Sequence, residues 1–225
     1  MEPGKKVILQ KTKVNDAFFN KEAVLPYGLK IEEIRQAIID TYEFLDKINC
    51  FLLENGYLRL EELLLGNTLS GFLSEVIVKS ISNNSKKITR NKKVGGHPDL
   101  IQVGAYQNNS VLLGKDGIEI KTSKQRGGWQ GHNPEEGYLI IFRYILDESE
   151  RPAVEKTPIE FVQVLCAQLA LNDWSFSGRV GKSRRTITAS ITKSGMLKLR
   201  SNPVYQHSDY IVGKKSSSRN QTVLE

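Results

Sequence analysis

The spacing of apolar residues changes along this chain, from a helical period before Pro98 to a strand period after it. Residues 30–55 carry an apolar stripe at helical spacing, and residues 69–80 carry a second stripe with Asn67 or Thr68 as its cap. A chain that combines amphipathic helices with short alternating strands must bury the apolar faces of both against each other. The pattern therefore predicts an α/β fold with helices packed on a sheet.

Short β-rich runs dominate the part of the chain after Pro98. A helix starting near Thr157 is an alternative to the strand predicted over 161–169, but valine-rich alternation favours the strand. The last predicted pair is a hairpin turning at Lys193-Ser194-Gly195. The predicted strands are 100–106, 111–113, 118–123, 138–146, 161–169, 186–192 and 196–200.

The chain carries a net charge of +7, and its C-terminal third holds the whole excess of basic residues. A second basic cluster, without acidic residues, spans 79–93. Localised basic stretches are typical of proteins that meet a phosphate backbone, although solvated Lys/Arg faces are also common.

Several protein classes are excluded by length and composition. The 225 residues suffice for one domain with a core, and no apolar run approaches the roughly 20 residues of a membrane span. No secretory signal is recognisable, so we expect a cytoplasmic protein without membrane partners. The two cysteines, Cys50 and Cys166, lie in apolar stretches and indicate buried thiols. No CxxC pair supports a zinc finger.

Three polar residues stand at the edges of predicted strands. Asp99 begins one strand, and Glu119 and Lys121 lie two positions apart on a neighbouring one. Because side chains alternate along a strand, Glu119 and Lys121 project from one face and Ile120 from the other. Two carboxylates are the ligands that Mg²⁺ prefers, and a lysine can hold or activate an attacking water. The group predicts metal-assisted phosphodiester hydrolysis.

With Pro98-Asp99 and Glu119-Ile120-Lys121, the chain resembles the PD-(D/E)xK nuclease superfamily, and within it the type II restriction endonucleases. The resemblance implies a restriction-endonuclease-like mixed central sheet flanked by helices, with a basic β-rich C-terminal region. It implies Asp99, Glu119 and Ile120 as metal ligands and Lys121 as a catalytic residue. Glu75 stands where many such enzymes place an extra catalytic acid, although a solvated helix face is the alternative.

The same resemblance implies Mg²⁺ as the cofactor, with Mn²⁺ able to substitute and Ca²⁺ supporting DNA binding only. Its substrate would be double-stranded DNA, cut to 5′-phosphate ends by a homodimer whose symmetry matches the target. A cognate DNA methyltransferase would be a partner in such a restriction system. Two alternatives stay open: a structure-selective repair or junction nuclease of the same superfamily, and a non-enzymatic DNA-binding protein.

Two segments are candidates for DNA contact. The first is a glycine-rich loop after residue 123, whose amide and basic side chains suit base edges and phosphates. Trp129 within it has packing in the core as an equal alternative. The second is a basic loop that lacks the glycine spacing of a P-loop. The predicted contacts are Lys124, Gln125, Arg126, Trp129, Gln130, His132 and Asn133, and then Arg179, Lys182, Arg184, Arg185 and Thr186.

These assignments divide the chain into four parts. Residues 1–65 form an N-terminal helical region for packing or dimer contacts, and residues 66–146 form the catalytic core. Residues 147–212 are the basic β-rich part of the same domain, and residues 213–225 are a flexible tail.

Overall fold

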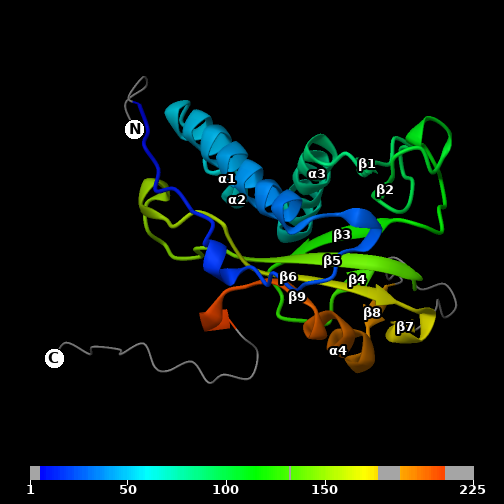
Figure 1. Ribbon diagram of the computed structural model, residues 1–225. Coiled ribbons are helices and arrows are strands. Elements are labelled where there is room, and N and C mark those ends of the chain that lie inside the picture. Colours follow the sequence, from blue (N-terminus) through cyan, green and yellow to red (C-terminus); the bar gives the residue numbers. More distant parts are fainter. Residues whose placement is uncertain (1–5, 132, 177–187, 211–225) are drawn as a thin grey trace, which may run out of the picture.

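A computed structural model describes residues 6–131, 133–176 and 188–210. Its centre is a six-stranded mixed sheet of order β1-β2-β3-β5-β6-β9, in which only β3 and β5 run parallel. Figure 1 shows helices on both faces of this sheet. The prediction of an α/β fold with a mixed central sheet flanked by helices is therefore confirmed. The strands are β1 (Ile88–Arg90), β2 (Leu100–Gln102), β3 (Ile118–Ser123), β5 (Gly137–Ile145), β6 (Glu160–Leu169) and β9 (Pro203–Gln206).

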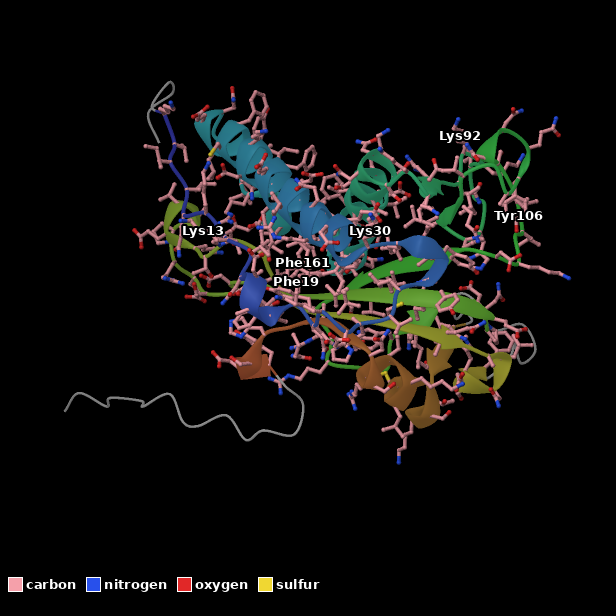
Figure 2. All side chains as sticks on the ribbon, viewed as in Figure 1. Lys13, Phe19, Lys30, Lys92, Tyr106 and Phe161 are labelled. Carbon is pink, nitrogen blue, oxygen red and sulfur yellow. The ribbon has the colours of Figure 1, made fainter. Side chains whose placement is uncertain are left out.

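Two long helices, α1 (Ile31–Glu54) and α3 (Gly66–Asn84), cover one face of the sheet (Figure 1). The short α2 (Leu60–Leu63) connects them. The Glu33 carboxylate accepts a hydrogen bond from the backbone N–H of Lys30 at 2.8 Å, which satisfies one of the free donors at the start of α1. The apolar stripe of α1 then packs on α3 and the sheet. Phe161, labelled in Figure 2, is fully buried in this core, where its ring stacks on Tyr42.

The other face of the sheet is covered by a second, smaller layer. It consists of α4 (Lys193–Ser201) and a three-stranded sheet of order β4-β8-β7, formed by β4 (Gln130–Gly131), β8 (Ala189–Ile191) and β7 (Trp174–Phe176). Trp129, Trp174 and Leu199 are buried between this layer and β5 and β6. The connection from β3 to β5 runs through this layer, as a crossover between parallel strands requires.

The predicted hairpin of 186–192 with 196–200 is wrong in its second arm. Residues 196–200 belong to α4, because Met196 and Leu199 are spaced three apart and both are buried on one face of a helix. The Thr192 hydroxyl accepts from the Gly195 N–H at 3.3 Å and caps this helix. The first arm is described only as β8, since 177–187 lie outside the described residues.

Two other predicted strands differ from the structure. The strand expected at 100–106 ends at Gln102, and 111–113 form a loop in which Leu112 and Leu113 are exposed. Short apolar runs do not distinguish a strand from a loop when the residues have no partner to bury against. The second helix begins at Gly66, before the predicted caps Asn67 and Thr68.

None of the helices in the described residues has the combination of length and apolar character that spanning a bilayer requires. The expected thiols are unpaired: Cys166 is buried and Cys50 is half-buried. The predicted tail, 213–225, lies outside the described residues. The division of the chain into 1–65, 66–146 and 147–212 stays a prediction.

Candidate functional site

The candidate site lies where β2 and β3 diverge. Their ladder is registered at Leu100 and Ile118, so its continuation would place Pro98 opposite Ile120. Proline has no N–H to donate to the Ile120 carbonyl. The Ile120 N–H is bonded instead by the Asp99 carboxylate, at 2.9 Å from Oδ2. The Asp99 side chain therefore takes the place of a backbone partner where β3 extends beyond its pairing with β2, which we call the open edge of β3.

Side chains of β3 alternate between the two faces of the sheet. Ile118, Ile120 and Thr122 are buried on the α3 side, and the Thr122 hydroxyl donates to the Ser70 carbonyl at 2.6 Å. Glu119 and Lys121 are half-buried on the opposite side, with 3.1 Å between Lys121 Nζ and Glu119 Oε1. The alternation predicted for these two residues agrees with this arrangement.

The two carboxylates differ in their surroundings. Burial raises the pKa of Asp99 to about 7, and the nearby charge of Glu119 adds to the effect. Burial alone would also raise the pKa of Glu119, but the His97 hydrogen bond and the Lys121 charge outweigh it and hold that pKa below its ordinary value. At neutral pH, therefore, Glu119 carries its charge while Asp99 titrates.

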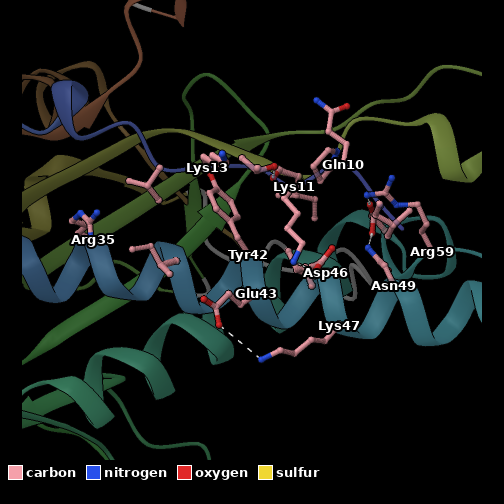
Figure 3. Close-up of a pocket in the computed structure, with 18 residues that line it drawn as sticks. Gln10, Lys11, Lys13, Arg35, Tyr42, Glu43, Asp46, Lys47, Asn49 and Arg59 are labelled. Atoms are coloured by element: carbon pink, nitrogen blue, oxygen red, sulfur yellow. Dashed lines mark hydrogen bonds and ion pairs between the residues drawn. The ribbon is translucent and has the colours of Figure 1, made fainter. Parts of the chain in front are cut away.

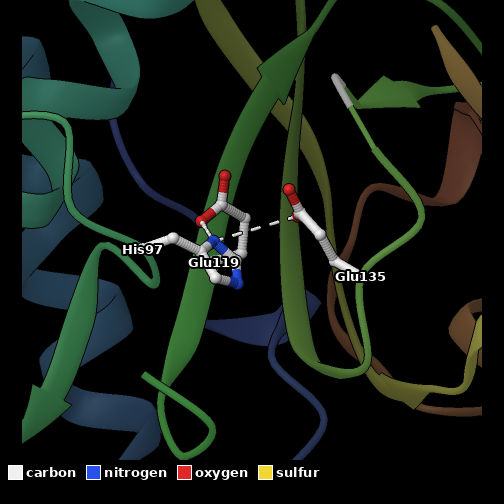
Figure 4. A group of neighbouring side chains, drawn as sticks. All are labelled: His97, Glu119 and Glu135. Atoms are coloured by element: carbon white, nitrogen blue, oxygen red, sulfur yellow. Dashed lines mark hydrogen bonds and ion pairs between the residues drawn. The ribbon is translucent and has the colours of Figure 1, made fainter. Parts of the chain in front are cut away.

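His97 and Glu135 complete the site from two other segments (Figure 4). The Nδ1 atom of His97 lies 3.0 Å from Glu119 Oε2 and 3.9 Å from Glu135 Oε2. The hydrogen bond to Glu119 raises the pKa of His97. One ligand atom from each of these three residues lies within 4.8 Å of the others, close enough for one ion to contact all three. The sequence reasoning assigned no role to His97 or Glu135.

A buried asparagine holds the segment that carries Asp99. The Asn91 amide donates to the carbonyls of Pro98 at 3.0 Å and Val111 at 2.8 Å, and its oxygen accepts from the N–H groups of Lys93 and Val111. The Asn91 N–H donates to the Asp99 carbonyl. Gly117 is required on the other side, since an added Cβ would lie 2.2 Å from Pro98 Cγ. The hydrogen bonds of Asn91 and the close packing of Gly117 against Pro98 thus hold Asp99 in place.

The donor set at this edge fits a hard divalent cation. Asp99 and Glu119 supply carboxylate oxygens, and the Ile120 carbonyl lacks a ladder donor from Pro98. Burial, and after it the charge of Glu119, raises the pKa of Asp99 to about 7, and a bound cation would favour the charged form of this carboxyl.

Glu75 lies at the margin of the site. Its carboxylate is exposed on α3 and forms an ion pair with Arg90 Nη2 at 2.5 Å. It is close enough for its charge to contribute to the raised pKa of Asp99. Glu75 therefore influences the site electrostatically, while its side chain is held by Arg90.

The glycine-rich loop holds one residue for which the prediction of DNA contact is wrong. Trp129 is 3% exposed in the second core, and its Nε1 donates to the Gln125 carbonyl at 3.2 Å. A bulky aromatic side chain enclosed in this way packs and does not meet a base. Among the described residues of the loop, the predicted contacts that are exposed are Lys124, Gln125, Arg126, Gln130 and Asn133.

Lys124 forms an ion pair with Glu148 at 2.6 Å, and the Arg126 carbonyl accepts from Arg200 at 3.4 Å. The basic cluster of 79–93 is exposed at its lysines, and Lys92 extends from the β1–β2 side of the molecule (Figure 2). The remaining predicted contacts lie outside the described residues: His132, Arg179, Lys182, Arg184, Arg185 and Thr186.

Two hollows differ in size and chemistry. A cavity of about 520 Å³ lies between the N-terminal segment and α1, and neither Asp99 nor Glu119 lines it (Figure 3). Several charged groups in its lining are paired with each other, such as Lys11 with Asp46 at 3.1 Å. A depression of about 20 Å³ is lined by His97, Glu119 and Glu135. Titratable groups line both hollows, but only the smaller one is lined by residues of the candidate site.

A scan against protein-family models finds no match to this chain, and comparisons with curated proteins and with solved structures find none either.

Proposed function

We propose that this protein is a Mg²⁺-dependent DNA endonuclease of the restriction type, with a restriction-endonuclease-like core. The observation that carries the proposal is that the Asp99 carboxylate is bonded to the β3 backbone at Ile120 and lies close enough to Glu119 for their charges to interact, with Lys121 paired to Glu119 on the same strand. A bound Mg²⁺ would neutralise charge on the scissile phosphate and lower the pKa of water. Asp99, Glu119 and the Ile120 carbonyl would hold it.

Each protein group has a distinct role in this proposal. Lys121, held against Glu119, presents an ammonium group that orients the attacking water or stabilises negative charge on the phosphate. His97 is a positioning residue, because its hydrogen bond fixes one oxygen of Glu119 and favours the charged form. Glu135 adds negative charge on the far side of His97.

The proposed substrate is double-stranded DNA, because localised basic stretches accompany the carboxylates. The lysines of the 79–93 cluster are exposed, no acidic residue lies in that stretch of sequence, and Lys92 extends from the β1–β2 side of the molecule (Figure 2). Such a surface attracts a phosphate backbone at low salt. Cutting both strands requires two such sites, so the proposal includes a two-fold dimer.

The test is digestion of a sequenced phage genome with purified protein and Mg²⁺, followed by mapping of the ends. Discrete fragments with 5′-phosphate ends that disappear in EDTA and in Asp99→Asn are expected. Glu150→Gln, which changes an exposed acid in a distant loop, is the matched control and should cut normally. Intact DNA at all metal concentrations would reject nuclease activity, and an unstructured smear would favour a structure-selective or nonspecific nuclease.

A further inference from the structure

Arg143 on β5 is buried without the partners that a buried cation requires. It is 3% exposed, and its Nε and Nη1 atoms are enclosed without a hydrogen bond to any described residue. No ion pair joins it to an acid in the part of the chain that the structure describes. Burial lowers its pKa, and the like charge of Arg126 lowers it further. An uncompensated buried charge costs several kcal/mol, so a guanidinium retained in this state calls for a counter-charge.

Arg59 provides the contrast within the same protein. It is 1% exposed, yet its Nη2 forms an ion pair with Glu61 at 2.7 Å and its Nη1 donates to the carbonyls of Ala153 and Lys156. Its charge is thus matched by an acid of the same chain. The Nε of Arg59 is also buried without a hydrogen bond, so the difference between the two arginines is the acidic partner, which Arg143 lacks among the described residues.

The register of the sheet places Arg143 near the candidate site. Lys121 lies opposite Ile141 and Ser123 opposite Arg143, so Arg143 is on the same sheet face as Lys121, two residues further along. Two residues span about 7 Å along a strand, and neighbouring strands are about 4.8 Å apart. Arg143 is therefore within a short distance of the lysine, on the face that carries Glu119.

The neighbours of Arg143 are cationic, aromatic or amide groups. Its guanidinium carbon lies 5.7 Å from the ring centre of Tyr210, at the end of the 3₁₀ turn Ser208–Tyr210. Gln163 lies opposite it on β6. Arg126 is exposed on the loop after β3, and its backbone is held by Arg200. Arg126 is close enough for its charge to act on Arg143, and guanidinium donors without a partner are groups with which proteins bind phosphate.

We propose that Arg143, together with Arg126, forms an oxyanion-binding site that receives a phosphate group on the Lys121 face of the sheet. The phosphate has two sources, the DNA backbone or a free oxyanion. The DNA source rests on the proposed function and would place a phosphate next to the scissile one. The free-oxyanion source does not depend on nuclease activity.

Thermal unfolding with inorganic phosphate tests the site without DNA or metal, at constant ionic strength set with KCl. The melting temperature of the wild type should rise with phosphate concentration, as for any ligand that binds only the folded state. Arg143→Met should abolish this rise, and in phosphate-free buffer it should melt at or above the wild-type temperature because it removes an unpaired buried charge. Arg126→Ala should require about tenfold more phosphate for the same rise.

Controls keep this measurement decisive. Arg35→Met, which removes an exposed arginine paired with Asp16 on α1, should keep the wild-type phosphate response. Asp99→Asn should keep it as well, so that failure of the nuclease proposal leaves the test intact. If Arg143→Met does not fold, Arg143→Lys, which keeps the charge with fewer donors, should show a weakened response. A wild-type phosphate response in folded Arg143 variants would overturn the proposal.

Affinity for a short DNA duplex in Ca²⁺ separates the two sources. If the DNA backbone supplies the phosphate, Arg143→Met should bind about tenfold more weakly, and the slope of log affinity against log salt should fall by about one. Unchanged DNA affinity together with a lost phosphate response would identify a free oxyanion as the ligand. If Arg143→Met keeps both the wild-type DNA affinity and the wild-type phosphate response, Arg143 binds no phosphate.

Discussion

The Asp99 carboxylate accepts the hydrogen bond of the Ile120 N–H at 2.9 Å, in the ladder position that faces Pro98. Since Pro98 cannot donate and its carbonyl is bonded by Asn91, the backbone of β2 cannot complete the ladder there. The acid is thereby held at the strand edge by the backbone of the strand that carries Glu119 and Lys121. One hydrogen bond thus links the two halves of the candidate site.

Replacing Asp99 by Asn should stabilise the metal-free protein at pH 8. The pKa of Asp99 is raised by burial to about 7, so the folded state binds a proton that the unfolded state releases near pH 4. The stability linked to this proton is fully present below pH 4 and is lost as pH rises through 7. The free energy of unfolding of Asp99→Asn should exceed that of the wild type by about 4 kcal/mol at pH 8.

Urea unfolding of both proteins in EDTA between pH 4 and pH 8 measures this difference. The difference in free energy of unfolding between the two proteins should decrease toward pH 4. At pH 8, Mg²⁺ added in excess of the EDTA should stabilise the wild type but not the variant. A variant less stable than the wild type at pH 8 would mean that the charged form of Asp99 is favoured in the fold.

Replacing Lys121 by Gln should reduce cleavage by a factor of about 10² or more, because the ammonium group that we propose to act on the attacking water is lost. Specific DNA binding in Ca²⁺ should be retained, since the carboxylates remain. Single-turnover cleavage and fluorescence anisotropy measure the two effects separately. Lys47→Gln, an exposed lysine on α1, is the matched control. Undiminished cleavage by Lys121→Gln would exclude this lysine from the reaction.

Replacing His97 by Gln should weaken metal binding by about tenfold, as loss of a group that orients a metal ligand does. The physical reason is the 3.0 Å hydrogen bond to Glu119, which lowers the pKa of that carboxyl. Mg²⁺ titration followed by cleavage rate should show a higher half-saturation concentration with a similar rate at saturation. An equal loss of rate at all Mg²⁺ concentrations would indicate a direct catalytic role instead.

Replacing Asn91 by Ala should destabilise the protein by about 2 kcal/mol or more, because the carbonyls of Pro98 and Val111 lose their donor in a buried place. The same change should lower cleavage through displacement of Asp99. Thermal unfolding and cleavage should both respond, whereas Asn133→Ala in the exposed loop should leave stability unchanged. Normal cleavage by folded Asn91→Ala would show that Asp99 is held without it.

Much of the local structure could be predicted because it follows from short-range periodicity. The apolar stripe on residues 30–55 falls on one face only in a helix, and the alternation on 118–123 falls on one face only in a strand. The bounds of α1 and β3 match these two segments closely. The sequence pattern predicts a strand over residues 196–200, whereas in the structure the Thr192 cap and the burial of Met196 and Leu199 on one face belong to a helix. Propensity is a weak guide where a segment is this short.

The amino-acid sequence by itself determined that Glu119 and Lys121 share one face of a strand, since alternation is a property of the extended backbone. It also determined that Asp99 follows a proline unable to complete a ladder. Only the tertiary structure decided that His97 contacts Glu119, that Trp129 is buried, and that Arg143 is enclosed with no acidic partner in the part of the chain that the structure describes. Those relationships join segments distant in the chain, and they depend on register and packing, which no local pattern specifies.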